Sequence, residues 1–370
     1  MPRIDRNAAL LRMLAWMVLA LVSSKAALAQ DHTVQIGVLS LFHPKELLLR
    51  PVNGSALALE MDSNGERQRH VLKSYDAAAV IQVVDDQVEV RCAAFETLRG
   101  TTLRMSGVVD GMNAFVLEVR GKLRRQYTGT LRVRIRTGIL EPVVTMPLET
   151  AVASVVQAET QPGATLEALK AQAVASRSFL VARQSGHVDF DFCDTTHCQF
   201  LRASPAANSL AAKATKATSG LVLMYQNSNS VEVPLAAMYA RSCGGKTRTL
   251  QEIGVSPNRG YPYYSVHCDY CSHHPETWQR TVDVHGISTE RERLEWNRIH
   301  GWGAIPSIPI DVSKGVAAHS EKVLTGRGTG HGLGLCQLGA ADMGRRGATF
   351  TEILSHYYPN TRIASAYPSK

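Results

Sequence analysis

Glu159 is the residue whose type and position best suit proton-transfer chemistry. It ends the segment LETAVASVVQAE, and the triplet QPG at 161–163 breaks the helical pattern directly after it. A carboxyl group at a helix end beside such a break can reach a groove, while apolar neighbours raise its pKa. A general acid needs a pKa raised in this way. The alternative is a solvated glutamate that merely ends a helix; Asp194 and Glu167 are the nearest other acids.

A second set of residues has the types that bind a metal ion. His187, Cys193, His197 and Cys198 follow the pattern H-x5-C-x3-H-C. Two imidazoles and two thiolates form a closed tetrahedral set, which suits structural rather than catalytic zinc. The spacing differs from that of a zinc finger, and an exported protein could instead form a Cys193–Cys198 disulfide. We expect zinc here, and either cross-link would fix the loop that follows a predicted helix.

Glycine occupies every second position from 326 to 334 in GRGTGHGLGLCQLGA. This spacing matches neither the dinucleotide fingerprint nor a P-loop, and the leucines argue against a flexible linker. Because strands alternate faces, an extended segment of this kind has one bare face. Such a face indicates the close approach of a ligand, such as a sugar, or of another strand. We expect His331 and Gln337 to lie beside it and contact the ligand.

The segment YARSCGGKT, at residues 239–247, is a second candidate for sugar contact. Gly244 and Gly245 allow backbone amides to approach a ligand, and Arg241 and Ser242 offer hydrogen-bond donors. An arginine or lysine here can pair with a carboxylate group of a ligand. The alternative is a tight turn between strands.

Four motifs follow one another along the chain: LETAVASVVQAET with ATLEALKAQAVASRSF, then CDTTHCQ, YARSCGGKT and GRGTGHGLGLCQLGAADMGRRG. In this order they resemble the stage II sporulation protein D (SpoIID) / LytB family. The resemblance covers roughly residues 140–360, whereas residues 30–140 resemble the family only in being β-rich. It implies peptidoglycan as the ligand, with Arg177 and Gln199 among the residues that contact it. Some members of the family hold zinc at the place of the four metal-type residues.

The resemblance implies one of two functions. Some members are lytic transglycosylases that cut glycan strands stripped of their peptides. Such an enzyme would use Glu159 as both acid and base, because the sugar's own 6-hydroxyl attacks in place of water. Ordinary glycosidases use two carboxylates, and no second acid stands out in these motifs. The alternative is a non-catalytic peptidoglycan-binding protein that stimulates a cell-wall amidase. A zinc hydrolase is a weaker third reading, because water would have to replace one protein ligand.

The elements that must position these residues predict an α+β fold, with mixed helices and short strands around a glycan-binding groove. Residues 30–140 are predicted to be β-rich, and residues 141–370 to form the SpoIID/LytB-like domain. β-Branched runs separated by turn residues predict strands at Val34–Leu39, Ala79–Val84, Val88–Cys92, Ala114–Val119 and Thr130–Ile135. Apolar residues at helical spacing predict a helix over 148–159. We expect a second helix over 166–184, ended by Gly186, and another over 337–345.

Two capping signals accompany these helices. Thr165 is a plausible cap for the second helix. Thr349 and Glu352 have capping-box spacing for a last short helix that stops before Pro359.

The first residues predict export. A basic region from Arg3 to Arg12 precedes the apolar run LAWMVLALV and the cleavage-type triplet ALA at 27–29. We expect residues 1–29 to be a signal peptide and the mature chain to start at Gln30, without a transmembrane helix, in the periplasm or cell wall. An uncleaved anchor is the alternative. Removal of residues 1–29 lowers the net charge from +8 to +5. A mildly basic chain suits an acidic polymer, and we expect no nucleic-acid partner.

The chain has seven cysteines, an odd number. Outside the cytosol this leaves a thiol unpaired, unless cysteines bind metal or pair between chains. Cys268 and Cys271 have Cys-x2-Cys spacing with histidines nearby, and a metal site, a disulfide or pairing with Cys243 all remain open. Cys336 stands where the family leads us to expect a small hydroxyl residue, and we interpret it as a small buried hydrophobe.

Overall fold

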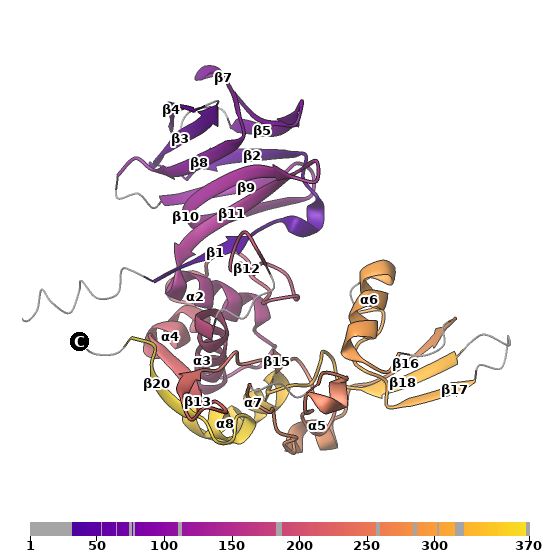
Figure 1. The fold of residues 1–370 in the computed structure, drawn as a ribbon. Helices are drawn as coiled ribbons and strands as arrows, with labels where there is room; N and C mark the ends of the chain where they lie inside the picture. Colours follow the sequence, from indigo (N-terminus) through magenta and orange to yellow (C-terminus); the bar gives the residue numbers. More distant parts are fainter. Residues whose placement is uncertain are drawn as a thin grey trace, which may run out of the picture.

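The computed structural model (Figure 1) describes residues 32–367 except 53, 64, 74–75, 77, 110–112, 183–186, 257–259, 284–286, 302 and 315–321. The predicted signal peptide therefore lies outside the described residues. The described part joins a strand-rich N-terminal portion to a largely helical remainder with small sheets, which confirms the predicted α+β class. No helix in this part is long and apolar enough to cross a membrane.

Twelve strands form one large sheet. They are β1 (Thr33–Gly37), β2 (Glu46–Pro51), β3 (Ala56–Ser63), β4 (Glu66–Lys73), β5 (Ala79–Val84), β6 (Gln87–Cys92), β7 (Phe95–Gly100), β8 (Thr102–Gly107), β9 (Asn113–Val119), β10 (Leu123–Arg136), β11 (Ile139–Pro147) and β12 (Phe192–Cys193). The long strand β10 pairs with β9 along its first half and with β8 along its second. The sheet therefore divides at β10 into two branches. Strand β7 ends one branch and β8 belongs to the other, and the chain runs directly from β7 to β8, so that the sheet is nearly closed.

Strand β11 carries the chain from the sheet to the helices. It pairs with β1 and β10 and continues directly into α2 (Leu148–Glu159). Strand β12, which follows the second helix, pairs in parallel with β1. The sheet thus runs past residue 140 and anchors both ends of the segment that holds the first two helices.

Helix α3 (Leu166–Ala182) is the central buried helix, with 12 of its 17 residues buried. Around it pack α2, α4 (Leu210–Ala217), α7 (Gln337–Arg345) and α8 (Phe350–Tyr357). Its many alanines allow this close approach. One cluster of buried apolar side chains runs from the large sheet into α2 and α3, so the sheet supports the helices directly.

Three small sheets complete the described part of the chain. β13 (Leu221–Gln226) pairs with β14 (Glu232–Pro234) and β20 (Arg362–Ser365), and β15 (Tyr239–Ala240) pairs in parallel with β19 (Leu335–Cys336). β16 (Thr277–Val282), β17 (Asp311–Lys314) and β18 (Lys322–Arg327) form the third. With α6 (Glu290–His300) this sheet makes a lobe to one side in Figure 1, and the short helix α5 (Asp269–His273) lies between the lobe and α7.

Most of the predicted elements are confirmed. Helices α2 and α7 have the predicted bounds, and α3 is described as far as Ala182. The Thr165 hydroxyl accepts a hydrogen bond from Ala168 N at 3.3 Å, and Thr349 and Glu352 form the capping box of α8. The five predicted strands correspond to β1, β5, β6, β9 and β10. Strand β10 begins at Leu123, seven residues before the predicted Thr130, and the other ends agree within two residues.

The glycine run is not the extended strand that its spacing predicts. Strand β18 ends at Arg327, and Gly328, Gly330, Gly332 and Gly334 all have positive φ. A Cβ atom on Gly328 would clash with the carbonyl oxygen of Ser242, and one on Gly334 with that of Met238. Other parts of the protein therefore approach the bare positions: backbone at Gly328 and Gly334, and the side chains of Trp278 and Arg248 at Gly326 and Gly332.

Candidate active site around Glu159

Packing fixes the place of Glu159 at the last residue of α2. The helix buries one face against the sheet, through Leu148, Val152, Val155 and Val156. Thr160 then leaves the helical conformation, and Gly163 follows with a φ of 75°. The chain therefore turns away directly after Glu159, as the QPG triplet predicts.

Glu159 is half-buried. Phe200 N donates a hydrogen bond to its Oε1 atom at 3.1 Å. Burial raises the pKa of Glu159 to about 7; the Phe200 N–H and the positive charge of Arg202 lower it only in part. The Arg202 guanidinium lies over the Phe200 ring, 4.8 Å from its centre. A carboxyl group with this pKa can both hold and release a proton near neutral pH.

Two glutamines hold the backbone of Glu159. Gln337 Nε2 donates to the Glu159 carbonyl oxygen at 3.1 Å, and Gln161 Nε2 donates to the same oxygen at 3.0 Å. Gln161 Nε2 also lies 3.2 Å from Gln337 Oε1. The last carbonyls of a helix lack partners within the helix, so these donors complete the end of α2. The structure thus brings Gln337 to the site, as predicted, but against the backbone of Glu159.

Arg241 joins this group through Gln161. Its Nη1 atom donates a hydrogen bond to Gln161 Oε1, and its guanidinium pairs with Glu276 at 3.1 Å. The side chain remains 43% exposed, so Arg241 is a cation that a ligand can reach. Gln161, Glu276 and Arg202 were not predicted as site residues. Only Gln161 had a signal in the sequence, since it follows Glu159 in the QPG triplet.

Two buried polar atoms near this site have no hydrogen-bond partner among the described residues. They are the Tyr239 hydroxyl and Gln199 Oε1. Tyr239 lies near Ser176 and Gln172 without a well-aligned hydrogen bond. Burial raises its pKa well above the usual value, and the charge of Glu159 raises it further. Unpartnered buried polar atoms are costly, which marks Tyr239 as a candidate ligand contact. It lies in the candidate segment 239–247, but the sequence analysis did not single it out.

The four metal-type residues do come together in the loop before Phe200. The ligand atoms of His187, Cys193, His197 and Cys198 all lie within 4.8 Å of one another. His187 Nε2 is 3.3 Å from Cys198 Sγ, and His197 Nδ1 is 3.5 Å from Cys198 Sγ. A tetrahedral zinc ion with usual bond lengths places a nitrogen and a sulfur ligand about 3.6 Å apart. Both cysteines are free thiols here, so the donor set fits zinc and the disulfide alternative is not what the structure shows.

The other two acids considered are committed to structural contacts. Asp194 accepts from Leu39 N at 3.0 Å and pairs with Arg125 at 3.1 Å. Glu167 pairs with Lys170 at 2.6 Å, accepts a hydrogen bond from a backbone N–H, and has a lowered pKa through these contacts despite some burial. Glu167 lies in the first turn of α3 with a lowered pKa. Burial raises the pKa of Asp194 to about 6, but Arg125 and Leu39 N hold its carboxylate.

Arg177 does not match its predicted role as a substrate contact. Its side chain is fully buried and forms two hydrogen bonds to the Glu149 carboxylate, at 2.7 and 2.6 Å. Its remaining donors meet backbone carbonyls, including that of Leu221 at 3.1 Å. Every arm of the guanidinium is used within the protein, so Arg177 joins α2, α3 and β13.

Other predicted contacts are also engaged within the protein. Ser242 is 1% exposed, and its hydroxyl lies 3.5 Å from Cys271 Sγ. A Cβ atom on Gly244 would clash with the backbone of Arg327, and Gly245 faces Ser272 across ordinary contact distance. We therefore no longer expect Ser242 or Gly244 to touch a ligand.

His331 is neutral in this environment. Burial lowers its pKa to about 4. Its Nδ1 atom accepts from Leu333 N at 2.9 Å, so the ring proton lies on Nε2, and the Tyr239 backbone forms the ring's other hydrogen bond. His331 thus supports the segment that carries Tyr239.

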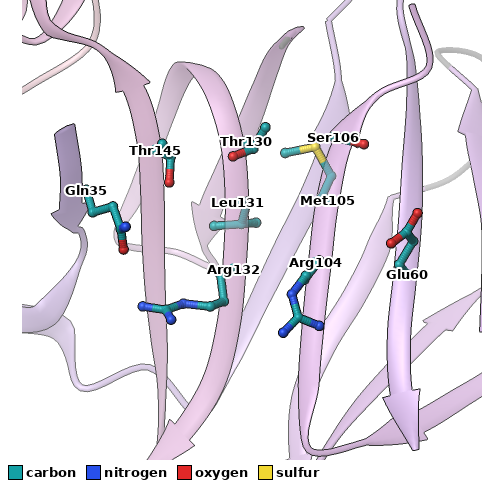
Figure 2. Close-up of a pocket in the computed structure, with 9 residues that line it drawn as sticks. All are labelled: Gln35, Glu60, Arg104, Met105, Ser106, Thr130, Leu131, Arg132 and Thr145. Carbon is teal, nitrogen blue, oxygen red and sulfur yellow. The ribbon is translucent and has the colours of Figure 1, made fainter. Parts of the chain in front are cut away.

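Two cavities lie away from Glu159. One of about 360 Å³ opens on the large sheet, across β1, β11, β10, β8 and β3 (Figure 2), with Gln35, Arg104, Arg132 and Thr145 among its lining residues. The other, of about 340 Å³, lies between α2 and α4, beside Glu149 and Thr215. Glu159 lines neither, so the predicted groove around it remains a prediction.

Comparison with known proteins agrees with the motifs. The chain is similar to an uncharacterized protein of Brachyspira hyodysenteriae, with 26% identity over 277 residues that cover 64% of this chain and 72% of the relative. Residues 136–225 match the family model described as stage II sporulation protein, SpoIID. This segment runs from the end of β10 to β13 and contains Glu159, Phe200 and all four metal-type residues. The match assigns residues 136–225 to a SpoIID domain, which is consistent with a lytic function at the cell wall.

Proposed function

We propose that this protein is an exported lytic transglycosylase that cleaves peptide-free glycan strands of peptidoglycan, with Glu159 as the single acid and base. The observation that carries the proposal is the half-buried Glu159 carboxyl group, whose pKa is raised to about 7. It lies at the end of a packed helix, and the exposed Arg241 is linked through Gln161 to the Glu159 backbone. Burial holds the proton that the first step needs, and the pKa near neutrality allows the same group to take a proton back.

The reaction needs only one carboxyl group. Glu159 donates its proton to the glycosidic oxygen as the bond from that oxygen to C1 of the sugar breaks. The 6-hydroxyl of the same sugar then forms a bond to C1, and its proton passes to Glu159. No water is consumed, and the carboxyl group ends the cycle protonated. A two-carboxylate hydrolase needs a second acid that activates water, and Asp194 and Glu167 are held in structural contacts.

Several groups support this role of Glu159. Gln161 and Gln337 hold the end of α2, and Phe200 N–H fixes one carboxyl oxygen. The Tyr239 hydroxyl and the Arg241 guanidinium are the donors that we assign to the glycan, the latter to a carboxylate of the sugar. Gln199, with its unpartnered Oε1 atom, is a further contact in this proposal.

Zinc bound by His187, Cys193, His197 and Cys198 belongs to the same proposal as a structural ion. When bound, it would cross-link the loop that presents Phe200 N–H to Glu159. Four protein ligands leave no open position for substrate, so these residues position the loop and take no part in bond breaking.

The test compares wild-type protein with Glu159→Gln on purified peptide-free glycan strands. Glutamine keeps the size and the acceptor for Phe200 N–H but cannot donate a proton as an acid does. We expect cleavage to fall by roughly a hundredfold or more, while glycan binding stays close to wild type. Glu167→Gln is the matched control on α3 and should keep full activity.

The alternative is a non-catalytic protein that stimulates an amidase. This alternative is established if wild-type protein binds the glycan without cutting it, and if wild-type protein and Glu159→Gln stimulate a cell-wall amidase equally. Loss of activity in both glutamine variants would instead show that the effect is not specific to Glu159.

A further inference from the structure

Four cysteines that are distant in the sequence form a second cluster. Cys243 follows β15, Cys268 and Cys271 lie at the start of α5, and Cys336 ends β19. All four side chains are buried, with exposures between 0% and 7%. Their sulfur atoms all lie within 4.8 Å of one another. The three segments that supply them are separated by 25 and 65 residues, so the fold, not local spacing, assembles the cluster.

The spacing of the sulfur atoms fits a single tetrahedral ion. Zinc–sulfur bonds of 2.3 Å place the sulfurs of a tetrahedral site about 3.8 Å apart. The Cys271 and Cys336 sulfurs are 3.5 Å apart, and no pair in the cluster exceeds 4.8 Å. An iron–sulfur cluster sets several irons and sulfide ions between its cysteines and therefore needs wider spacing. All four residues are free thiols in this structure.

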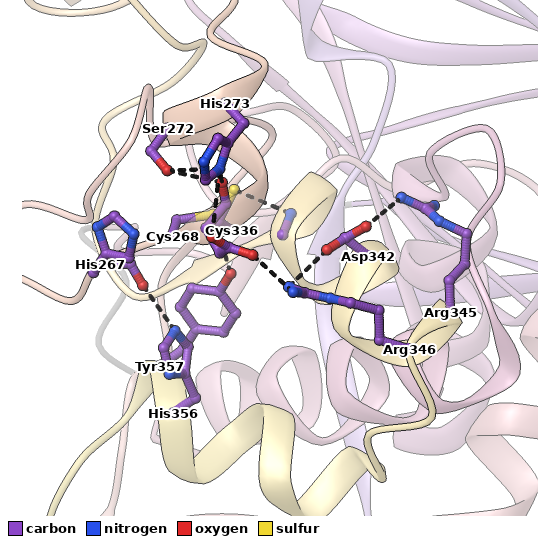
Figure 3. Close-up of polar contacts among 12 residues, drawn as sticks. His267, Cys268, Ser272, His273, Cys336, Asp342, Arg345, Arg346, His356 and Tyr357 are labelled. Carbon is purple, nitrogen blue, oxygen red and sulfur yellow. Dashed lines mark hydrogen bonds and ion pairs between the residues drawn. The ribbon is translucent and has the colours of Figure 1, made fainter.

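Donors already point at the sulfur atoms. Gly339 N, in the first turn of α7, donates to Cys336 Sγ at 3.4 Å. The Tyr357 hydroxyl lies 3.5 Å from Cys268 Sγ, as Figure 3 shows, and the Ser242 hydroxyl lies 3.5 Å from Cys271 Sγ. A Cβ atom on Gly339 would clash with the Tyr357 hydroxyl and crowd Cys268 Sγ. Such donors stabilise the negative charge that thiolates carry when they bind a metal.

We infer that Cys243, Cys268, Cys271 and Cys336 bind one structural zinc ion. Thiolates in a tetrahedral set select zinc or iron, and zinc is the common ion of closed four-cysteine sites. The full burial of the cluster leaves no position for substrate or water. The inference does not depend on the proposed function, since it rests on the cysteines and their neighbours alone.

The position of this site gives it a consequence for Glu159. Cys243 lies two residues after Arg241, and Cys336 directly precedes Gln337. Strands β15 and β19, which carry Tyr239 and Cys336, pair with each other in parallel. An ion at the cluster would therefore clamp together the two segments that bring Tyr239, Arg241 and Gln337 to the end of α2.

The test measures the metal in full-length protein purified without chelators. Wild-type protein should contain about two zinc ions per chain if both sites are filled. Cys193→Ser/Cys198→Ser should keep one, and X-ray absorption at the zinc edge should show four sulfur ligands at about 2.3 Å and no nitrogen. Cys243→Ser/Cys271→Ser should lose that ion. Cys92→Ser, which changes the cysteine outside both clusters, should lose none.

Three results would overturn the inference. They are a Cys193→Ser/Cys198→Ser protein that folds without zinc, iron with acid-labile sulfide in the purified protein, or a disulfide between any two of the four cysteines. If that variant does not fold, wild-type protein alone decides. In the X-ray absorption of wild-type protein, an average of three sulfur ligands and one nitrogen ligand per zinc supports two filled sites. An average of two sulfur and two nitrogen ligands shows that only the histidine-containing site is filled and contradicts the inference.

Discussion

At the scale of single residues, the raised pKa of Glu159 makes the free energy of unfolding depend on pH. The pKa of its carboxyl group rises from 4.5 to about 7 on folding. The folded protein therefore binds this proton more tightly than the unfolded chain. The resulting stabilisation is fully present below pH 4.5 and is lost as pH rises through 7. At about 1.4 kcal/mol per pKa unit, the loss amounts to about 3 kcal/mol.

We expect Glu159→Gln to have almost the stability of wild type at pH 4.5 and to be more stable at pH 8, by up to about 3 kcal/mol. Denaturant unfolding at the two pH values measures this difference. Because His331 is present in both proteins, its opposite pH dependence cancels in the comparison. Equal stability of the two proteins at pH 8 would mean that the carboxyl group is not buried as described.

The corrected role of Arg177 gives a second prediction at this scale. Glu149→Gln should remove the charge that pairs with the buried guanidinium, and the loss of one partner of such a pair costs about 3–5 kcal/mol of stability. The exposed pair of Glu232 and Arg362 is the control, and Glu232→Gln should change the melting temperature little. Glycan affinity of folded Glu149→Gln should equal that of wild type. If Glu149→Gln lost glycan affinity without losing stability, the result would support Arg177 as a substrate contact.

At the scale of elements, the loop at 187–200 joins the histidine-containing metal set to Glu159. Cys193→Ser should release about one zinc ion and lower the melting temperature, because metal binding and folding are coupled. Metal analysis and thermal unfolding measure both effects, with Cys92→Ser as the control. Metal-free wild-type protein whose Cys193 and Cys198 are oxidised would favour the disulfide instead.

The helices show what the sequence could predict. Apolar spacing located α2, and the Thr165 cap with the following Gly186 located α3. The Thr349 and Glu352 pair located the start of α8. Helix α6 was missed although Thr289 and Glu292 form a capping box, because its sequence ERERLEWNRIH has little of the apolar periodicity on which the predictions depended. A mainly charged helix on a separate lobe gives no such signal.

The site shows what the sequence could not predict. The place of Glu159 followed from a local break in the chain, and the four residues of the 187–198 loop lie within 12 positions. Arg177 was misjudged because its partner Glu149 lies 28 residues away on another helix. The glycine spacing indicated a strand, since positive φ values and the packing of distant backbone leave no periodic mark. The four-cysteine cluster needed the pairing of β15 with β19.

At the scale of the whole molecule, the two clusters account for the odd number of cysteines. Two belong to the 187–198 loop, four to the buried cluster and one, Cys92, to strand β6. The two clusters flank Glu159 in the fold: one lies in the loop that ends at Phe200, the other joins the segments of Arg241 and Gln337. A nearly closed sheet supports α2 beneath them. We interpret the molecule as a scaffold whose cross-links hold one half-buried acid in place.

The central claim is that Glu159 breaks a glycosidic bond without water. The most direct test is whether oxygen from water enters the newly formed glycan end. Wild-type protein should be incubated with peptide-free glycan in water labelled with oxygen-18, and the masses of the products measured by mass spectrometry. The account predicts that wild-type protein forms 1,6-anhydro-muramyl ends, which are lighter than reducing ends by one water and carry no label. Glu159→Gln should form almost no such ends. New reducing ends that carry oxygen-18 would contradict it, because a hydrolase would then have made the cut.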